Sequence, residues 1–302
     1  MATLFHKYSN KDQMKILSFY ETLYRCDNYL YGYLRVMWQC IQQYPSYPMF
    51  HHEESGIWED KNQVVGMVHL SGPGLGNVSI DIHPEYMELF DDMVAYAEKK
   101  FCGTNREGNR YIRTSSPETI PSADKVLKKH HFEKCGTGNL FYRNVEKDME
   151  EEQMPLGFQK RCLDEVYDFD KLSRLIWDAL HYPGEPPRFH DDIYLPVKQA
   201  WFQYQKEFCP VILDKYGNYA AFCGVWFDQS TKVTYIEPLV CGSGYQNMGL
   251  EQICIQEMIK NCIEIGANTI FIIPSLENRK ILENAGFQTL KLENWMKIWN
   301  QC

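Results

Sequence analysis

In the second half of the chain, apolar and polar positions alternate between strand and helix patterns. Short apolar runs bounded by turn residues predict strands at 157–165, 209–217, 220–228, 233–240, 268–274 and 292–300. Helical spacing of apolar positions predicts helices at 167–182, 193–207, 250–266 and 276–284. The run at 268–274 is apolar throughout, as in a strand buried on both faces. Strand 233–240, the helix after it and strand 268–274 are therefore expected to form a right-handed parallel crossover.

The first half repeats this order of elements. Strands are predicted at 2–9, 51–61, 63–72, 77–84, 110–116 and 139–145. Helices are predicted at 85–101 and 123–132, and the segment 11–43 is predicted to be helical with at least one break. The stretches "HPEYM" and "GSGYQ" each follow a third strand and open a helix, and "KKHHF" and "ENAGF" form matching late turns. The pattern predicts a duplicated α/β fold.

One charged stretch, "NVEKDMEEEQMPLG", divides the two halves. It predicts a first domain at 1–148, a linker at 149–154 and a second domain at 155–302. A length of 302 residues is compatible with two domains.

Composition narrows the class of protein. Hydrophobic residues make up 44% of the chain, so the core needs neither disulfides nor a metal. The 11 cysteines include no CxxC pair, which argues against a disulfide framework and against zinc. The net charge of −9 makes nucleic acid an improbable partner. No apolar run is long enough for a membrane span, and the N-terminus lacks the apolar centre of a signal peptide, which predicts a cytoplasmic protein without membrane contact.

The stretch "SGYQNMGLEQICIQEM" places a glycine-containing turn before an amphipathic helix. The first amides of a helix have no intrahelical partners and carry a partial positive charge, which suits a phosphate. Gly249 would let the backbone approach an anion closely. The alternative is that Asn247 only caps the helix and Gly244 only makes the turn.

Strand "TYIEPLV", turn "GYQNMGLE", a helix, strand "TIFIIP" and the late "ENAGF" together resemble the GNAT superfamily of acetyl-CoA-dependent N-acetyltransferases. The superfamily signature is Arg/Gln-x-x-Gly-x-Gly/Ala, and Gln246, Gly249 and Glu251 occupy its fixed positions, with Glu251 replacing a small residue. The resemblance extends from Gly157 to the C-terminus. It implies two tandem GNAT-like domains, each a mixed, mostly antiparallel sheet with a parallel crossover and flanking helices.

The resemblance also implies an acetyl-CoA site. The pantetheine arm would pair with the strand at Leu239, Val240 and Cys241, at the point where this strand parts from the next. The amides of the turn would bind the pyrophosphate, and Asn278 is a further candidate contact. The turn residues implied are Gln246, Asn247, Met248, Gly249, Leu250 and Glu251.

Some positions depart from the superfamily pattern. Leu282 stands where a tyrosine often serves as general acid, and Ser275 stands where an asparagine is frequent. The carboxylate of Glu251 would repel a phosphate by about 1 kcal/mol at 4 Å in water.

In the first half, Met87, Phe90 and Asp92 occupy the motif positions, and the Phe90 ring is expected to fill the pyrophosphate space. One CoA site per chain is therefore expected, in the second half.

Acetyl transfer to an amine needs a base and an acid. Glu237, beside the expected thioester, is the candidate base, and Tyr235 is a candidate acid. Pro238 cannot donate to a sheet ladder, which predicts a local irregularity of the strand. The loop 181–196 is expected to cover the acceptor, by analogy with the superfamily.

These inferences favour an N-acetyltransferase acting on an amine, most simply a small molecule. Antibiotic, polyamine, amino acid and protein N-terminus all stay open as acceptors, as does the oligomeric state. The alternatives are a protein that binds CoA without catalysis, which Leu282 and Glu251 favour, and a structural or interaction protein.

Overall fold

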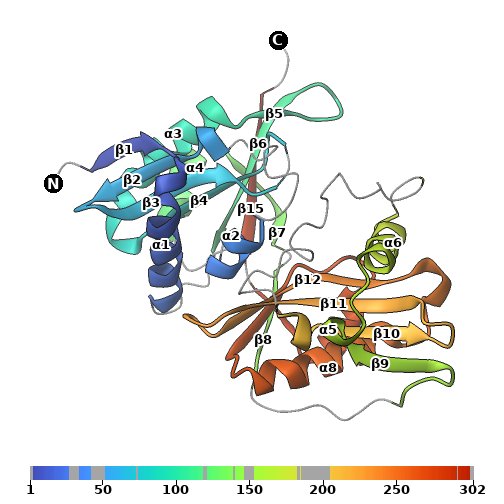
Figure 1. Cartoon of the computed structure of the whole chain (residues 1–302). Helices are drawn as coiled ribbons and strands as arrows, with labels where there is room; N and C mark the ends of the chain where they lie inside the picture. Colours follow the sequence, from blue (N-terminus) through green and yellow to red (C-terminus); the bar gives the residue numbers. More distant parts are fainter. Residues whose placement is uncertain are drawn as a thin grey trace. The chain divides into compact units, whose positions relative to one another are not determined.

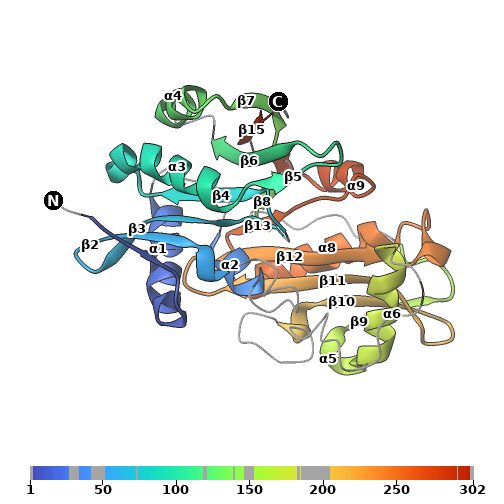
Figure 2. The same ribbon diagram turned by 90° about the horizontal axis from the view of Figure 1, so that it is seen from above.

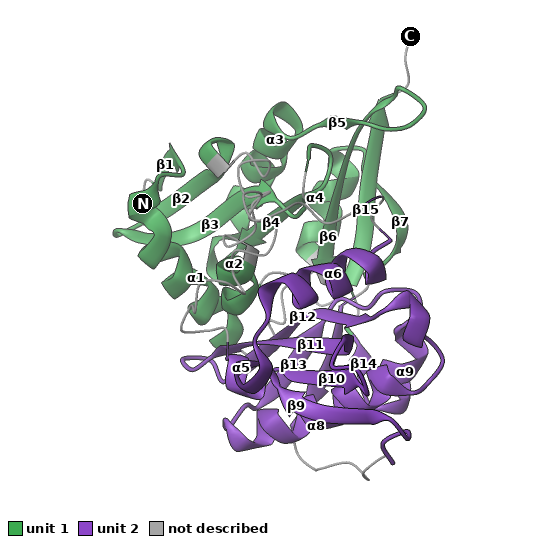
Figure 3. Cartoon of the chain, turned by 45° about the vertical axis from the view of Figure 1, so that its right-hand side comes forward, with its two compact units in different colours: residues 1–42, 46–139, 290–302 green, residues 43–45, 140–289 purple. Residues whose placement is uncertain are grey.

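The structure is a computed structural model that describes residues 3–26, 34–41, 52–72, 74–117, 121–138, 140–145, 153–181, 184, 205–290 and 292–299. The chain forms two units (Figures 1 and 3). Unit 1 is built from residues 1–42, 46–139 and 290–302, and unit 2 mainly from residues 140–289.

Unit 2 contains a seven-stranded sheet with the order β14-β8-β13-β12-β11-β10-β9. Its strands are β8 (Phe141–Asn144), β9 (Phe158–Cys162), β10 (Pro210–Asp214), β11 (Tyr219–Asp228), β12 (Val233–Cys241), β13 (Thr269–Ile272) and β14 (Gln288–Thr289). Its helices are α5 (Leu163–Val166), α6 (Phe169–Ala179), α8 (Leu250–Glu264) and α9 (Arg279–Asn284), with 3₁₀ turns η5 (Lys206–Phe208) and η6 (Ser243–Tyr245). All pairs are antiparallel except β12 with β13, so the predicted parallel crossover is confirmed.

Helices α6 and α8 cover opposite faces of this sheet, and α8 lies along β11 and β12 (Figures 1 and 2). Because both faces are covered, every residue of β10 and β11 is buried, which explains their continuous apolar runs. Helix α8 turns an apolar stripe toward the sheet, and its fully buried members are Leu250, Cys254, Ile255, Met258, Ile259 and Cys262.

Unit 1 contains two four-stranded sheets, with the orders β1-β2-β3-β4 and β5-β6-β15-β7. Its strands are β1 (Leu4–Lys7), β2 (Gly56–Asp60), β3 (Gln63–Leu70), β4 (Val78–Ile82), β5 (Gly103–Thr104), β6 (Arg110–Pro117), β7 (Glu133–Thr137) and β15 (Leu292–Trp299). Its helices are α1 (Gln13–Arg25), α2 (Arg35–Ile41), α3 (Phe90–Lys100) and α4 (Pro121–Lys129), with 3₁₀ segments η1 (Asn10–Asp12), η3 (His52–Glu54) and η4 (Pro84–Leu89). The order of elements therefore repeats that of unit 2, as the sequence predicts.

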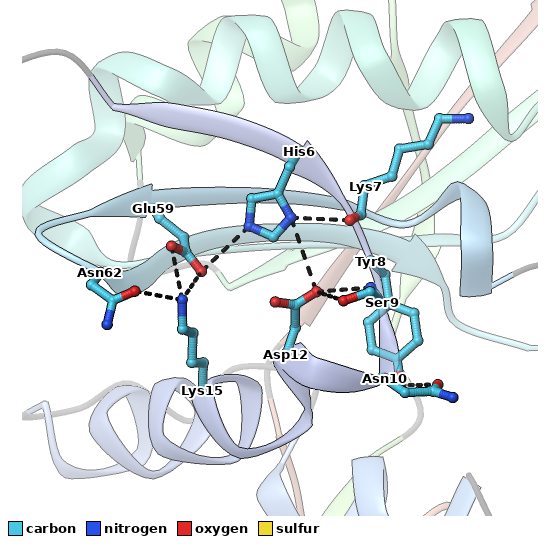
Figure 4. A network of polar contacts seen from close by, with 9 residues as sticks. All are labelled: His6, Lys7, Tyr8, Ser9, Asn10, Asp12, Lys15, Glu59 and Asn62. Carbon is cyan, nitrogen blue, oxygen red and sulfur yellow. Dashed lines mark hydrogen bonds and ion pairs between the residues drawn. The ribbon is translucent and has the colours of Figure 1, made fainter.

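A polar network fastens β1 and the start of α1 to β2 in unit 1 (Figure 4). His6 Nε2 lies 3.3 Å from Glu59 Oε1, and Lys15 Nζ donates to the same oxygen at 2.8 Å. Asp12 Oδ2 accepts a hydrogen bond of 2.8 Å from the Ser9 amide. Among the described residues, His6, Asp12 and Glu59 are the one group of possible metal ligands close enough to share an ion. Because Lys15 already supplies a positive charge to Glu59, we interpret the network as structural.

The two halves of the sequence exchange their closing strands, and this corrects the predicted division into contiguous domains at 1–148 and 155–302. Strand β8, from the end of the first half, lies between β13 and β14 in the sheet of unit 2. Strand β15, from the end of the chain, lies between β6 and β7 in unit 1. Both segments were predicted to be strands, but an apolar pattern does not tell which sheet a strand joins. Of the predicted linker at 149–154, residues 149–152 lie outside the described residues.

The exchange makes each half of the sequence incomplete. We predict that residues 1–148 and residues 149–302, produced separately, do not fold cooperatively, because each fragment lacks a strand from the middle of a sheet. Produced together, the fragments should assemble. Circular dichroism and limited proteolysis measure both states, and full-length chain cleaved between the fragments after folding is the matched control. A cooperative unfolding transition in isolated 149–302, as stable as in the whole chain, would contradict the exchange.

Candidate active site

Strands β12 and β13 part halfway along β12. Their parallel pairing runs from Val233 and Thr269 to Ile236 and Ile272 and then ends. Beyond Ile236, β12 continues beside β11 and pairs with it again from Leu239 to Cys241. Among the described residues, no strand pairs with the other edge of this segment, and the predicted separation of the two strands is confirmed.

A bulge shapes β12 at the point of separation. Cys223 pairs with Leu239 and Val225 with Ile236, so Glu237 and Pro238 together face Gly224. A Cβ atom on Gly224 would collide with the carbonyl oxygen of Glu237, so the close approach of the two strands requires glycine. The predicted irregularity at Pro238 is confirmed.

The two candidate catalytic residues lie next to each other at this bulge. The Tyr235 hydroxyl donates to Glu237 Oε2 at 3.4 Å. The indole N–H of Trp226 donates to the Glu237 carbonyl oxygen at 3.0 Å, which holds the backbone of Glu237 against β11. Tyr235 is buried and Glu237 is half-buried, so their polar groups meet at the edge of the core.

Asn278 reaches the free segment of β12 from the far side of the separation. Its side-chain amide donates to the Leu239 carbonyl oxygen at 3.3 Å, and its own backbone N–H donates to Ser275 Oγ at 3.2 Å. Asn278 is 9% exposed. The structure therefore brings Asn278 and Leu239 together, as expected for residues that share one site.

The turn before α8 contains two left-handed residues. Asn247 has φ of 63° and Gly249 has φ of 76°. The N-cap residue of α8 is Gly249, and no side chain caps this end of the helix. The alternative in which Asn247 caps the helix is therefore wrong. A Cβ atom on Gly249 would meet no atom within 4 Å, so the space beside Gly249 is open.

Several backbone N–H groups of this turn have no hydrogen-bond partner in the described part of the chain. The first intrahelical bond runs from the Ile253 N–H to the Gly249 carbonyl oxygen at 3.2 Å. In the described part of the chain, the backbone N–H groups from Gln246 to Glu251 make no hydrogen bond. Unpartnered amides, an open space and the positive end of a helix are the features that bind a phosphate group.

Tyr245 anchors the turn to the β10–β11 hairpin. Its hydroxyl donates to Asp214 Oδ2 at 2.8 Å. Burial would raise the pKa of Asp214, but the bonds that it accepts from Asn218, Tyr245 and the Tyr216 amide outweigh burial and lower this pKa to about 2. Asp214 therefore stays charged, and the anchor intact, at neutral and mildly acidic pH.

The charge of Glu251 acts on the end of β12. Burial and the nearby negative charge of Glu251 raise the pKa of Cys241 to about 12. The Cys241 thiol therefore stays protonated at neutral pH.

The corresponding segment of unit 1 has a different backbone. The 3₁₀ segment η4 runs directly into α3, and no residue from His83 to Phe90 has positive φ. Phe90 is 4% exposed and packs in the hydrophobic core of unit 1. The expectation that its ring fills the pyrophosphate space is therefore wrong. Unit 1 instead lacks the open turn, because its helix continues from the preceding residues.

Other expected features fall in different places. Leu282 is fully buried in α9, so its position contributes packing and no acid. The expected acceptor loop 181–196 and the expected helix 193–207 lie mostly outside the described residues.

Sequence reasoning missed the Tyr245–Asp214 anchor. The stretch "DKYGN" does signal a turn that begins at Asp214, but nothing in it points to Tyr245.

Comparisons with known proteins agree with this geometry. Residues 169–287 match the sequence profile of the Acetyltransferase (GNAT) family. The fold resembles that of a GCN5-related N-acetyltransferase from Sphaerobacter thermophilus, with a TM-score of 0.63 at 12% identity over 98% of this chain and 95% of that one. It also resembles a tandem GNAT protein from the clavulanic acid biosynthesis pathway, with a TM-score of 0.61 at 11% identity over 100% of both chains.

A third similar structure is a GNAT-family acetyltransferase from Colwellia psychrerythraea, with a TM-score of 0.59 at 11% identity over 99% of this chain and 100% of that one. The sequence has no match among curated proteins. In the part of the chain that the structure describes, no helix has the length and apolar character needed to cross a bilayer.

The open turn makes a direct prediction. Gly249→Ala should weaken CoA binding by about tenfold or more, because a left-handed alanine is strained and its methyl group enters the space in front of the amides. Gly244→Ala is the matched control, since Gly244 has no positive φ and its Cβ would also meet open space. Calorimetric titration measures the affinities. Equal affinity of Gly249→Ala and wild type would exclude this turn as the phosphate site.

Proposed function

We propose that the protein transfers an acetyl group from acetyl-CoA to an amine, because residues 169–287 match the acetyltransferase (GNAT) family. The tandem GNAT fold of the whole chain supports acyl transfer as the type of reaction. The observation that carries the proposal is the open turn with unpartnered amides from Gln246 to Glu251, at the end of a strand whose edge is free.

The residues present fit the cofactor. The amides of the turn would hold the pyrophosphate, since charge-assisted hydrogen bonds are worth about 1.5–3 kcal/mol each and need no arginine here. The free edge of β12 at Leu239, Val240 and Cys241 would pair with the pantetheine arm, with Asn278 beside it. When bound, acetyl-CoA supplies the acetyl group and a thiolate leaving group.

Two side chains at the β12 bulge would move protons. Glu237 would accept the proton of the incoming ammonium or amine, directly or through water, because its carboxylate lies where the strands part. Tyr235 would donate a proton to the departing thiolate. Its hydroxyl already contacts Glu237, so a proton taken up by the carboxylate can be returned to the phenol.

The acceptor we propose is a small-molecule amine. Glu237 offers a negative charge to a cationic nitrogen, and the buried rings of Tyr235 and Trp226 lie beside it. Polyamines, amino acids, aminoglycoside-like antibiotics and peptide N-termini all carry such a group and make up the panel to be screened.

A second candidate function is CoA binding without catalysis. The observation that favours it is the full burial of Leu282, because the position at which the superfamily often carries an acid has none. The two candidates agree on CoA binding and differ in turnover. Thiol release from acetyl-CoA across the amine panel separates them.

We predict that Glu237→Gln lowers kcat by about 10²–10⁴-fold while leaving the CoA dissociation constant unchanged, because the variant keeps the shape of the side chain and loses the base. Thiol release measures kcat, and calorimetry measures CoA binding. Glu264→Gln, at the exposed last residue of α8, is the control and should match wild type. A Glu237→Gln enzyme with wild-type rates across the pH range would remove Glu237 from the mechanism.

A further inference from the structure

Asp178, in the last turn of α6, is hydrogen-bonded to the segment that precedes the open turn. Its Oδ2 accepts a hydrogen bond of 2.6 Å from the Ser243 backbone N–H, and its Oδ1 accepts one of 2.8 Å from the Ser243 hydroxyl. The two residues are 65 positions apart in sequence, so this contact joins two separate elements of unit 2.

The position of this carboxylate is unfavourable without a partner. The C-terminal end of a helix carries a partial negative charge, so an aspartate there is destabilised by its own helix. Ser243 supplies two donors, and both bonds are charge-assisted. Asp178 therefore has both of its oxygens engaged by one residue, in a place where local helix energetics disfavour an acid.

Close packing of α6 against Gly242 reinforces the contact between Asp178 and Ser243. Gly242 is buried, and a Cβ atom placed on it would lie 3.3 Å from Leu175 Cδ1 and 3.4 Å from Asp178 Oδ2. The Gly242 N–H donates to the Ala220 carbonyl oxygen at 2.9 Å. Helix α6 thus sits directly on the backbone that leads from β12 into η6.

Two carboxylates from different elements therefore fix η6. Asp178 holds Ser243 from α6, and Asp214 holds Tyr245 from the β10–β11 hairpin. The next residue is Gln246, whose backbone N–H makes no hydrogen bond within the described part of the chain. With both ends of this three-residue segment held, the direction of the following amides is determined before any ligand arrives.

We propose that Asp178 is a positioning residue for the CoA pyrophosphate, which it aligns through Ser243 without touching the cofactor. This inference rests on the proposed function. Preorganised donors bind an anion more tightly than donors that must be ordered on binding. Loss of Asp178 should therefore weaken the binding of ligands that carry the pyrophosphate and leave the rest of the site unchanged.

The test compares two probes on the full-length protein. CoA carries the pyrophosphate, and pantetheine lacks it. We expect Asp178→Ala to weaken CoA binding by about tenfold and to leave pantetheine binding unchanged. Asp178→Asn and Ser243→Ala each keep part of the contact and should weaken CoA binding by about threefold. Asp170→Ala, at an exposed aspartate of the same helix, is the matched control and should match wild type.

Calorimetry measures CoA binding, ligand-observed NMR measures pantetheine binding, and thermal unfolding without ligand reports on the fold. Equal CoA affinity of Asp178→Ala and wild type overturns the inference. Equal weakening of CoA and pantetheine also overturns it, because Asp178 would then act on the whole site. If Asp178→Ala does not fold, Asp178→Asn and Ser243→Ala decide by the same criteria. A wild-type protein that binds no CoA overturns the proposed function itself, and the inference falls with it.

Discussion

The candidate site depends on the short extent of pairing between β12 and β13. Parallel pairing of four residues ties the crossover together and ends at Ile236 and Ile272. Beyond this point, no strand among the described residues pairs with this edge of β12, which only the Asn278 side chain contacts at Leu239. The bulge opposite Gly224 produces this change of register while the sheet with β11 continues. A free strand edge is ordinarily a liability, so its presence beside an open helix end points to a ligand that completes the sheet.

The difference between the two units follows from the backbone at one turn. In unit 2, Asn247 and Gly249 adopt left-handed backbone conformations, which separate α8 from the preceding 3₁₀ turn. The space beside Gly249, at the start of α8, is open. In unit 1, η4 continues into α3 and uses its amides within the helical segment. The first half of the sequence also supplies β8 to the sheet of unit 2, next to β13. The half without the open turn is thus part of the framework that supports the site.

Much of this arrangement can be predicted from sequence, because it depends on local patterns. The apolar periods identify the strands and α8, Gly249 marks the turn, and Pro238 marks the irregular strand. The exchange of β8 and β15 cannot be predicted in this way, since a strand pattern describes faces and does not name a neighbour. The contacts of Asp178 with Ser243 and of Asp214 with Tyr245 cannot be predicted for a related reason. Each depends on a partner brought close by the fold, and a charged residue looks the same in sequence whether it is paired or solvated.

The central claim is that the chain has one CoA site, at the turn of unit 2. Calorimetric titration of the intact protein with CoA tests it most directly, because the stoichiometry needs no knowledge of the acceptor. The account predicts one CoA bound per chain. Two equivalents per chain would show that unit 1 retains a site, and no binding would show that the open turn of unit 2 serves another ligand.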